Sequence, residues 1–196
     1  MIRYLLLDLG GVLYEVVYQR TLERLGLPPQ HLSEFLQHPI VAEFEKGCLT
    51  QEEFVRYWQG HFPHLAPSAI LEAWNAMLKG PLPQAEEVLR RLATHYPLAL
   101  LSNTNTTHLE LVEPQIRPWR PYFQGIFFSN RLGQRKPDPA VYRTVLAQLG
   151  WLPATTLFVD DNPTNLQGAQ AAGLQTFLLP PNRPEKLLEY LALSPV

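Results

Sequence analysis

Hydrophobic residues recur along this chain with two different spacings, and the spacing changes with position. Short apolar runs that end at a polar residue predict buried strands at 3–8, 98–102, 125–129, 156–160 and 175–179. Segments with helical spacing alternate with these runs and predict helices at 84–95, 106–112, 139–149, 163–172 and 184–193. Pro114 is expected to end the second of these helices. Such alternation is typical of an α/β fold, so we expect a doubly wound parallel sheet, a Rossmann-like core, with helices on both faces.

Residues 16–79 differ from the rest of the chain because their apolar positions have helical spacing throughout. A first helix is expected to stop near Gly26, and others are expected at 31–37, 40–46, 50–58 and 67–78. Thr50 and Glu53 match a capping box, in which each side chain binds the backbone N–H of the other residue. The pattern predicts an all-helical domain, 16–79, inserted into a core made of 1–15 and 80–196.

Composition and charge exclude several classes of protein. With 16 Lys and Arg against 18 Asp and Glu, the 196-residue chain has a net charge of −2, so it has no electrostatic footprint for a nucleic acid or an anionic membrane. Its longest apolar runs, 4–7 and 98–101, are too short to cross a membrane, and Asp8 interrupts the first before a signal peptide forms. One cysteine, Cys48, allows no internal disulfide. We expect a cytoplasmic protein, monomeric or homodimeric.

Polar residues stand where four of the predicted strands end. They are Asp8, Ser102-Asn103, Ser129-Asn130 and Asp160-Asp161. Each of them alone is also what turns and helix N-termini favour. Parallel sheets, however, bind their ligands beyond the carboxyl ends of the strands, so the four together indicate one site at that edge.

The carboxylates of this set point to a metal ion. Asp8 follows three leucines, and Asp160 and Asp161 would lie near it, so that a divalent cation would relieve their mutual repulsion. Oxygen ligands without histidine or cysteine favour Mg²⁺ over Zn²⁺. Lys136, whose backbone is restricted by Pro137, adds a positive charge that suits an anionic substrate group.

These motifs resemble those of the haloacid dehalogenase-like hydrolase superfamily, most of whose members are Mg²⁺-dependent phosphatases. Asp8-Leu-Gly-Gly-Val-Leu looks like the first motif, and Leu-Leu-Ser102-Asn103 looks like the second. Lys136-Pro-Asp-Pro and Phe-Val-Asp160-Asp161 look like the third and the fourth, in the same order. The segment Ser-Asn-Thr-Asn-Thr-Thr-His resembles the alpha-D-glucose-1-phosphate phosphatase and epoxide-hydrolase N-domain branch. Residues 16–79 then resemble the helical cap that this family inserts after its first motif.

The resemblance implies a role for each matching residue. Asp8 would attack phosphorus, and Lys136 would neutralise charge on Asp8 and on the phosphoryl group, which makes these two catalytic. Mg²⁺ would be bound by Asp8, Asp161 and the backbone carbonyl of Gly10. The remaining residues would hold the substrate or orient the metal shell: Gly11, Ser102, Asn103 and Lys136 for the substrate, and Asp160, Asn165 and His108 behind the metal.

One position departs from the commoner family pattern. Gly10 stands where most of these phosphatases have a second aspartate that acts as general acid and base, a contribution of about 10²- to 10⁴-fold. His108 could supply the missing proton, or it could only lend a hydrogen bond at a helix start. A leaving group more acidic than a simple alkoxide, such as an anomeric hydroxyl, would need less protonation. The resemblance also makes Glu45 and Lys46 candidates for substrate selection, with an exposed charged turn as the alternative.

The sequence therefore predicts a Mg²⁺-dependent phosphatase of small phosphorylated metabolites, with sugar phosphates as the first guess, that acts through an aspartyl-phosphate. Two alternatives stay open. A 2-haloacid dehalogenase also lacks the second aspartate, but it needs no Mg²⁺, and the pair Asp160-Asp161 argues against it. A catalytically silent member that acts as a binding or regulatory module is supported by Gly10 alone.

Overall fold

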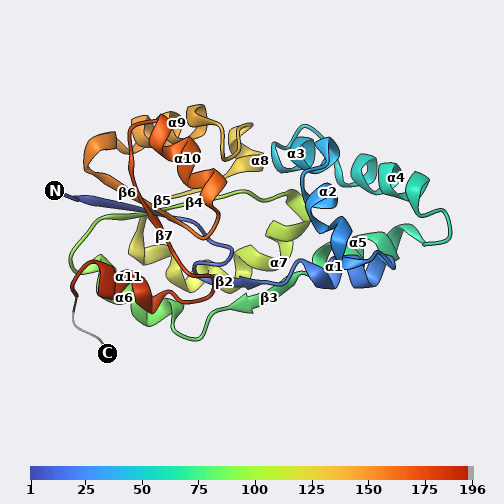
Figure 1. The fold of residues 1–196 in the computed structure, drawn as a ribbon, viewed down its shortest axis with the longest axis horizontal. Coiled ribbons are helices and arrows are strands. Elements are labelled where there is room, and N and C mark those ends of the chain that lie inside the picture. The colour runs from blue at the N-terminus through green and yellow to red at the C-terminus, as the bar shows by residue number, and fades with distance from the viewer. Residues whose placement is uncertain (194–196) are drawn as a thin grey trace.

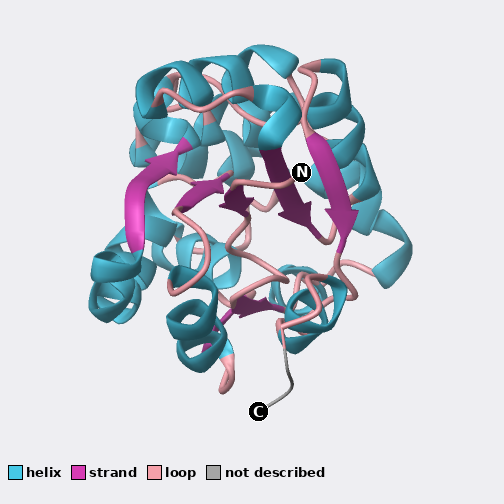
Figure 2. Ribbon diagram, turned by 90° about the vertical axis from the view of Figure 1, so that its left-hand side faces the viewer, coloured by secondary structure: helices cyan, strands magenta, loops and turns pink. Residues whose placement is uncertain are grey.

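The computed structural model of the protein describes residues 1–193. Its centre is a five-stranded parallel sheet with the strand order β5-β4-β1-β6-β7 (Figures 1 and 2). The strands are β1 Tyr4–Leu7, β4 Leu98–Ser102, β5 Phe123–Phe128, β6 Thr156–Asp160 and β7 Gln175–Leu178. The predicted parallel sheet is confirmed, and each strand lies within two residues of its expected position.

Both faces of the sheet are buried, which is why its strands are continuous apolar runs rather than alternating ones. In β1, Leu5 and Leu7 pack into one layer, while Leu6 between them packs into the other. Figure 1 shows the two helical layers on opposite sides of the strands. One layer contains α6 Ala85–Ala93, α7 Thr106–Ile116 and α11 Glu185–Tyr190, and the other contains α9 Pro139–Leu149 and α10 Pro163–Ala171.

The helices that precede α6 form a separate apolar cluster, on the right in Figure 1. We call this group, residues 19–75, the helical lobe. Its interior is aromatic: the rings of Phe44 and Phe54 stack with centroids 4.2 Å apart, and Trp74 lies 4.9 Å from Phe54. The predicted capping box at Thr50 is present. The lobe comprises α1 Gln19–Leu25, the 3-10 helix η1 Pro29–His31, α2 Leu32–Leu36, α3 Pro39–Glu45, α4 Gln51–His61 and α5 Pro67–Asn75.

Two short strands at the root of the lobe were not predicted. β2 Tyr14–Val16 and β3 Leu78–Pro81 pair antiparallel, where the pattern indicated only helix and a break. The helix expected to reach residue 78 ends at Asn75. Each strand has only three or four residues, and its partner lies far along the chain, so the pairing has no local signal. The chain enters the lobe through β2 and leaves it through β3, so this two-stranded ribbon contains both connections between the sheet and the lobe.

Helix α7 also differs from its prediction, because it continues through Pro114 to Ile116. Pro114 lies on the exposed face of the helix, where the carbonyl that loses its backbone donor can bind water instead. Three further elements complete the fold: the 3-10 helix η2 Arg117–Tyr122, the short α8 Ser129–Leu132 and the 3-10 helix η3 Pro153–Thr155.

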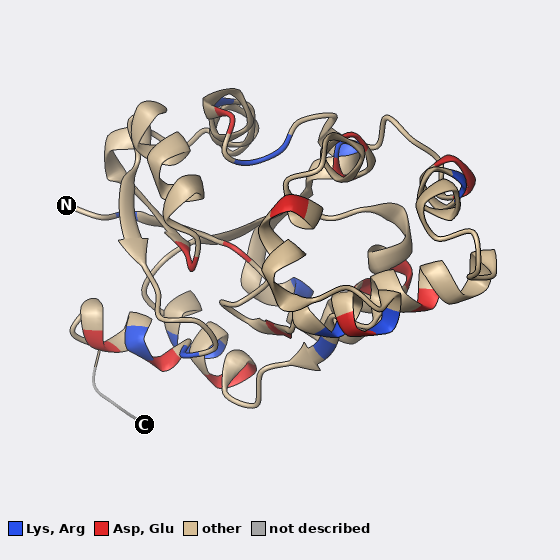
Figure 3. Cartoon of the chain, turned by 45° about the vertical axis from the view of Figure 1, so that its right-hand side comes forward, with Lys and Arg blue, Asp and Glu red and all other residues tan. Residues whose placement is uncertain are grey.

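Charged residues of both signs are scattered over the outer helices (Figure 3). Within residues 1–193, no helix has both the length and the apolar character that a membrane span requires.

Candidate active site

Asp8 directly follows β1 and is buried, with 8% of the residue exposed. Its Oδ1 accepts a hydrogen bond from the backbone N–H of Leu9 at 2.7 Å and lies 2.7 Å from the Nζ of Lys136. Burial raises the pKa of Asp8 well above its ordinary value, although Lys136 acts in the opposite direction. Asp160 and Asp161 raise this pKa further. Asp8 is therefore a buried carboxylate in a region of surplus negative charge.

Lys136 lies between α8 and α9, and its ammonium bridges two carboxylates. The Nζ atom lies 2.7 Å from Asp8 Oδ1 and 2.7 Å from Asp160 Oδ2, and the side chain is 1% exposed. It also lies 5.3 Å from the centroid of the Phe158 ring. Burial by itself lowers the pKa of Lys136, but Asp160 and Asp8 outweigh this effect and raise it above its ordinary value. The amine therefore remains a cation.

Asp160 ends β6, and both of its oxygens are already engaged in hydrogen bonds. The Nδ2 of Asn165 donates to them at 3.0 and 3.2 Å, and the backbone N–H of Asn162 donates to Oδ1 at 2.8 Å. Asn165 is held in turn from α9, because the hydroxyl of Tyr142 donates to its carbonyl at 2.6 Å. Asp160 thus orients Lys136 and Asn165, and fewer of its lone pairs remain for a metal ion than in Asp8 or Asp161.

The predicted carboxylates come together as an acidic cluster. Asp8, Asp160 and Asp161 each offer one oxygen, and these oxygens lie within 4.8 Å of one another. Burial and the neighbouring Asp160 raise the pKa of Asp161 to about 6. One ammonium faces three carboxylates, so the cluster keeps an excess negative charge that a divalent cation would balance. All donors are oxygens, which fits Mg²⁺.

The turn after Asp8 depends on glycine. Gly11 has a φ of +71°, and a Cβ at this position would lie 2.0 Å from Asp161 Oδ2, so no side chain fits there. The carbonyl of Gly11 accepts a hydrogen bond from the backbone N–H of Asn182 at 2.7 Å, which ties the turn to the segment after β7. Gly10 lies in the same turn, two residues after Asp8.

Ser102 and Asn103 follow at the end of β4, on the same edge of the sheet. Ser102 is 5% exposed. The Asn103 side chain makes two hydrogen bonds with the backbone of Lys136: its Nδ2 donates to the carbonyl, and its Oδ1 accepts from the N–H, both at 2.9 Å. Sequence reasoning missed this role of the Asn103 side chain in holding Lys136, because the two residues lie 33 positions apart and no local pattern joins them.

His108 lies in the first turn of α7, but its ring packs against the lobe. The ring stacks on Trp74 with centroids 4.9 Å apart and planes at 14°, and its Nε2 lies 3.4 Å from the Trp74 carbonyl. Its backbone N–H donates to Oδ1 of Asn105, the N-cap residue of α7, at 3.1 Å. Burial lowers the pKa of His108 to about 4. A neutral ring in this place favours the helix-start alternative over the proton donor.

The depressed pKa of His108 predicts a specific pH dependence of stability. The unfolded chain takes up a proton near pH 6.5 and the folded chain only near pH 4, so this group destabilises the fold as pH falls between these values. From pH 7 to pH 5 the wild type should lose about 2 kcal/mol of unfolding free energy through His108. His108→Phe keeps an aromatic ring beside Trp74, and its unfolding free energy should fall by about 2 kcal/mol less than that of the wild type over the same pH interval. Urea unfolding at both pH values measures the difference, and equal losses would contradict the buried neutral ring.

Glu45 and Lys46 end α3 of the lobe and have different environments. Glu45 Oε2 lies 2.8 Å from the Nε of Arg135, whereas Lys46 pairs with Glu43 at 2.5 Å. Ser129, at the end of β5, binds the same turn, because its hydroxyl donates to the Glu45 carbonyl at 2.6 Å. Gly47 follows with a φ of +72°, and a Cβ there would lie 2.3 Å from the carbonyl oxygen of Asn130. Of the two candidates, Glu45 is the one held against the sheet edge.

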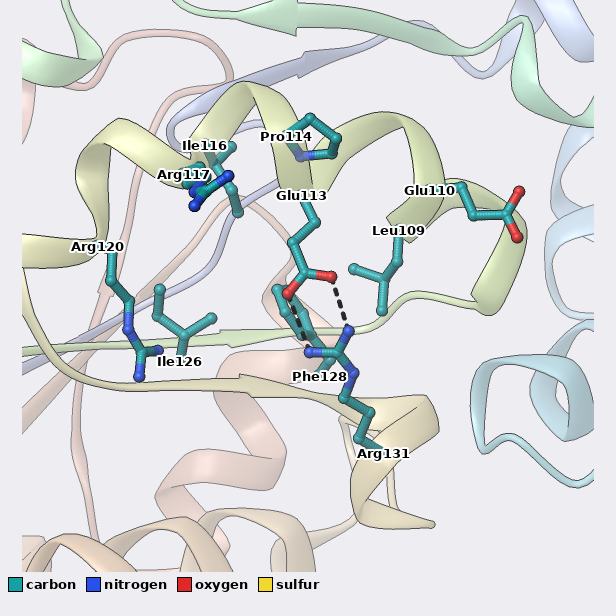
Figure 4. Close-up of a pocket in the computed structure, with 10 residues that line it drawn as sticks. All are labelled: Leu109, Glu110, Glu113, Pro114, Ile116, Arg117, Arg120, Ile126, Phe128 and Arg131. Atoms are coloured by element: carbon teal, nitrogen blue, oxygen red, sulfur yellow. Dashed lines mark hydrogen bonds and ion pairs between the residues drawn. The ribbon is translucent and has the colours of Figure 1, made fainter.

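A separate groove of about 770 Å³ lies between α7 and β5 (Figure 4). The ion pair of Glu113 and Arg131 crosses it, with Nη2 2.7 Å from Oε2. None of the predicted site residues lines this groove. Its lining is Leu109, Glu110, Glu113, Pro114, Ile116, Arg117, Arg120, Ile126, Phe128 and Arg131.

A family model described as haloacid dehalogenase-like hydrolase matches residues 2–173. The chain therefore belongs to the haloacid dehalogenase-like hydrolases, which confirms both the family resemblance and the prediction of a hydrolase. This assignment agrees with the parallel sheet and with the acidic cluster at the ends of β1 and β6.

Particular relatives cover nearly the whole chain. It is 27% identical to D-ribitol-5-phosphate phosphatase of Bacteroides thetaiotaomicron, over 90% of this chain and 91% of the relative. A crystal structure of a family enzyme from the same species, in a magnesium complex, is 30% identical with a TM-score of 0.80, covering 92% of this chain and 94% of that one. A hydrolase of this family from Porphyromonas gingivalis, predicted as such, is 27% identical with a TM-score of 0.82 and covers 98% of both chains.

Proposed function

We propose that this hydrolase is a Mg²⁺-dependent phosphatase of small phosphorylated metabolites that acts through an aspartyl-phosphate on Asp8. The observation that carries the proposal is the buried carboxylate of Asp8, 2.7 Å from the Lys136 ammonium and clustered with Asp160 and Asp161. A relative that is a sugar-alcohol phosphate phosphatase and a similar enzyme solved with magnesium support it.

In the proposed mechanism each residue of the site has a distinct role. A carboxylate oxygen of Asp8 forms a bond to phosphorus while the ester P–O bond breaks, and water later hydrolyses the acyl phosphate. Lys136 balances negative charge on Asp8 and on the phosphoryl oxygens, and Asn103 fixes the backbone of Lys136. Asp8, Asp161 and the Gly10 carbonyl would hold Mg²⁺, and Ser102, Gly11 and the Asn103 backbone would contact the phosphoryl oxygens. Bound Mg²⁺ supplies charge stabilisation for the transferring group.

The leaving group needs a proton, and most related phosphatases supply it from an aspartate two residues after the nucleophile. In this chain Gly10 stands at that position, so the usual general acid is missing. His108 is neutral and packed against Trp74, so it does not replace that acid. We propose that leaving groups of lower pKa, such as an anomeric hydroxyl, react faster than simple alkoxides. We also propose that residues 16–79 are the cap of this enzyme, and that the substrate enters between the helical lobe and the sheet edge.

The direct test is a panel of phosphate esters assayed with Mg²⁺ and with EDTA. We expect release of phosphate that requires Mg²⁺, with sugar 1-phosphates turned over faster than simple alkyl phosphates. Halide release from a 2-haloacid without added metal would instead support a dehalogenase. No turnover of any ester, including p-nitrophenyl phosphate, would support a catalytically silent protein and would refute the proposed function.

A further inference from the structure

Glu45, Lys46 and Arg135 lie where the helical lobe meets the sheet edge, and we call these three residues the wall of the site. Glu45 ends α3, and its side chain is 17% exposed and lies 2.8 Å from Arg135, the residue directly before Lys136. Burial raises the pKa of Glu45, while Arg135 and then Lys136 oppose this, which places Glu45 within electrostatic reach of the ammonium that binds Asp8. The carboxylate of Glu45 therefore lies next to the site where the phosphoryl group would react.

The cations near this wall are already in ion pairs. Lys136 is bound to Asp8 and Asp160, and Lys46 is bound to Glu43. Arg135 is balanced by Glu45. A substrate that brought a second anionic group to this wall would find no unpaired cation among these residues, and it would meet the carboxylate of Glu45.

The carboxylate of Glu45 can still interact with neutral polar groups. Its Oε2 and the Nε of Arg135 are buried and lie 2.8 Å apart in an ion pair. A carboxylate has more lone pairs than this one contact uses, so the hydroxyl group of a substrate can donate a hydrogen bond to it.

We propose that Glu45, with Arg135, selects phosphate esters whose leaving group is neutral and hydroxylated, and rejects those that carry a carboxylate or a second phosphate. This selection rests on the proposed phosphatase function. Polyol and sugar monophosphates belong to the accepted class, and phosphorylated hydroxy acids and bisphosphates belong to the rejected one.

A matched pair of esters tests the selection. Glycerol 3-phosphate and 3-phosphoglycerate, both racemic, share one skeleton and differ in a CH₂OH group against a carboxylate. We expect kcat/KM to favour glycerol 3-phosphate by about tenfold or more, the size of a modest like-charge penalty. Glu45→Gln should reduce this ratio by about tenfold, because Arg135 is then free to bind the carboxylate. Glu87→Gln, which leaves Arg90 unpaired on α6 away from this wall, is the control and should leave the ratio unchanged.

A second variant and a binding measurement keep the two proposals separable. Arg135→Gln should increase the preference for glycerol 3-phosphate, the opposite direction to Glu45→Gln, so loss of folding in one variant leaves the other to decide. Calorimetric titration of both esters into Asp8→Asn protein with Mg²⁺ measures selection without turnover, and tighter binding of glycerol 3-phosphate is expected. Equal affinity or equal kcat/KM for the two esters, or a ratio that neither variant moves, overturns the selection. Absence of turnover with selective binding would overturn only the phosphatase function.

Discussion

Asp8→Asn should lower kcat by about 10⁴-fold or more, because an amide cannot attack phosphorus and form the acyl phosphate. The fold should survive, since Lys136 keeps its second partner, Asp160, at 2.7 Å. The substitution also removes a buried carboxyl whose own pKa is raised by burial and by the neighbouring Asp160 and Asp161. The measurement is phosphate release from p-nitrophenyl phosphate with Mg²⁺, together with the thermal unfolding temperature of the same protein.

A matched control for this variant is Asp138→Asn. Asp138 is exposed and caps α9, where its Oδ1 accepts from the N–H of Ala140 at 2.8 Å, and asparagine caps helices about as well. Activity and stability should both remain close to wild type in this control. Turnover that persisted in Asp8→Asn would refute the covalent mechanism, whatever the control shows.

Lys136→Met should have the largest effect on stability, a loss of about 3–5 kcal/mol, because it leaves Asp8 and Asp160 buried without a counter-charge. The loss should shrink as pH falls. In the variant the folded-state pKa values of these carboxyls are raised, so protonation of the folded protein removes the unpaired charges first. Phosphatase activity should fall as well. Urea unfolding at pH 7.5 and pH 5 gives the two free energies.

The control here is Lys186→Met, which removes a lysine whose Nζ lies 2.9 Å from Glu189 on the surface of α11. Exposed ion pairs contribute little, so this change should leave stability nearly unaffected at both pH values. If Lys136→Met were as stable as the control at pH 7.5, the bridging ion pair would not be an essential part of the site.

Much of the fold could be predicted from the sequence because the relevant signals are local. The leucines of β1 and β4 form continuous apolar runs, which are typical of strands that are buried on both faces. Helices α1 and α9 end at Gly26 and Gly150, two glycines with positive φ. The ribbon of β2 and β3 was missed because its pairing joins distant segments. Pro114 was wrongly expected to end α7, because solvent exposure on that side of the helix is a property of the tertiary structure.

The candidate site also combines residues that the sequence predicted with contacts that only the folded structure shows. Asp8, Asp160 and Asp161 were expected from the ends of strands and Lys136 from its Lys-Pro motif, and the fold brings them together. The ring of His108 packs instead against Trp74, a residue of the lobe, and a histidine in a polar segment gives no sign of such a partner. Two contacts were likewise invisible in the sequence: the hydrogen bonds of Asn103 to Lys136 and the ion pair of Glu45 with Arg135.

By itself, the sequence determined the parallel sheet, the succession of helices between β1 and α6, and the residue types that meet at the sheet edge. Hydrophobic periodicity and strand-end position are properties of neighbouring residues, so they can be read along the chain. Only the tertiary structure decided which cations are already paired, which polar atoms remain unsatisfied, and whether His108 is charged. These depend on distance, burial and local charge between residues far apart in sequence, and those quantities exist only after the chain has folded.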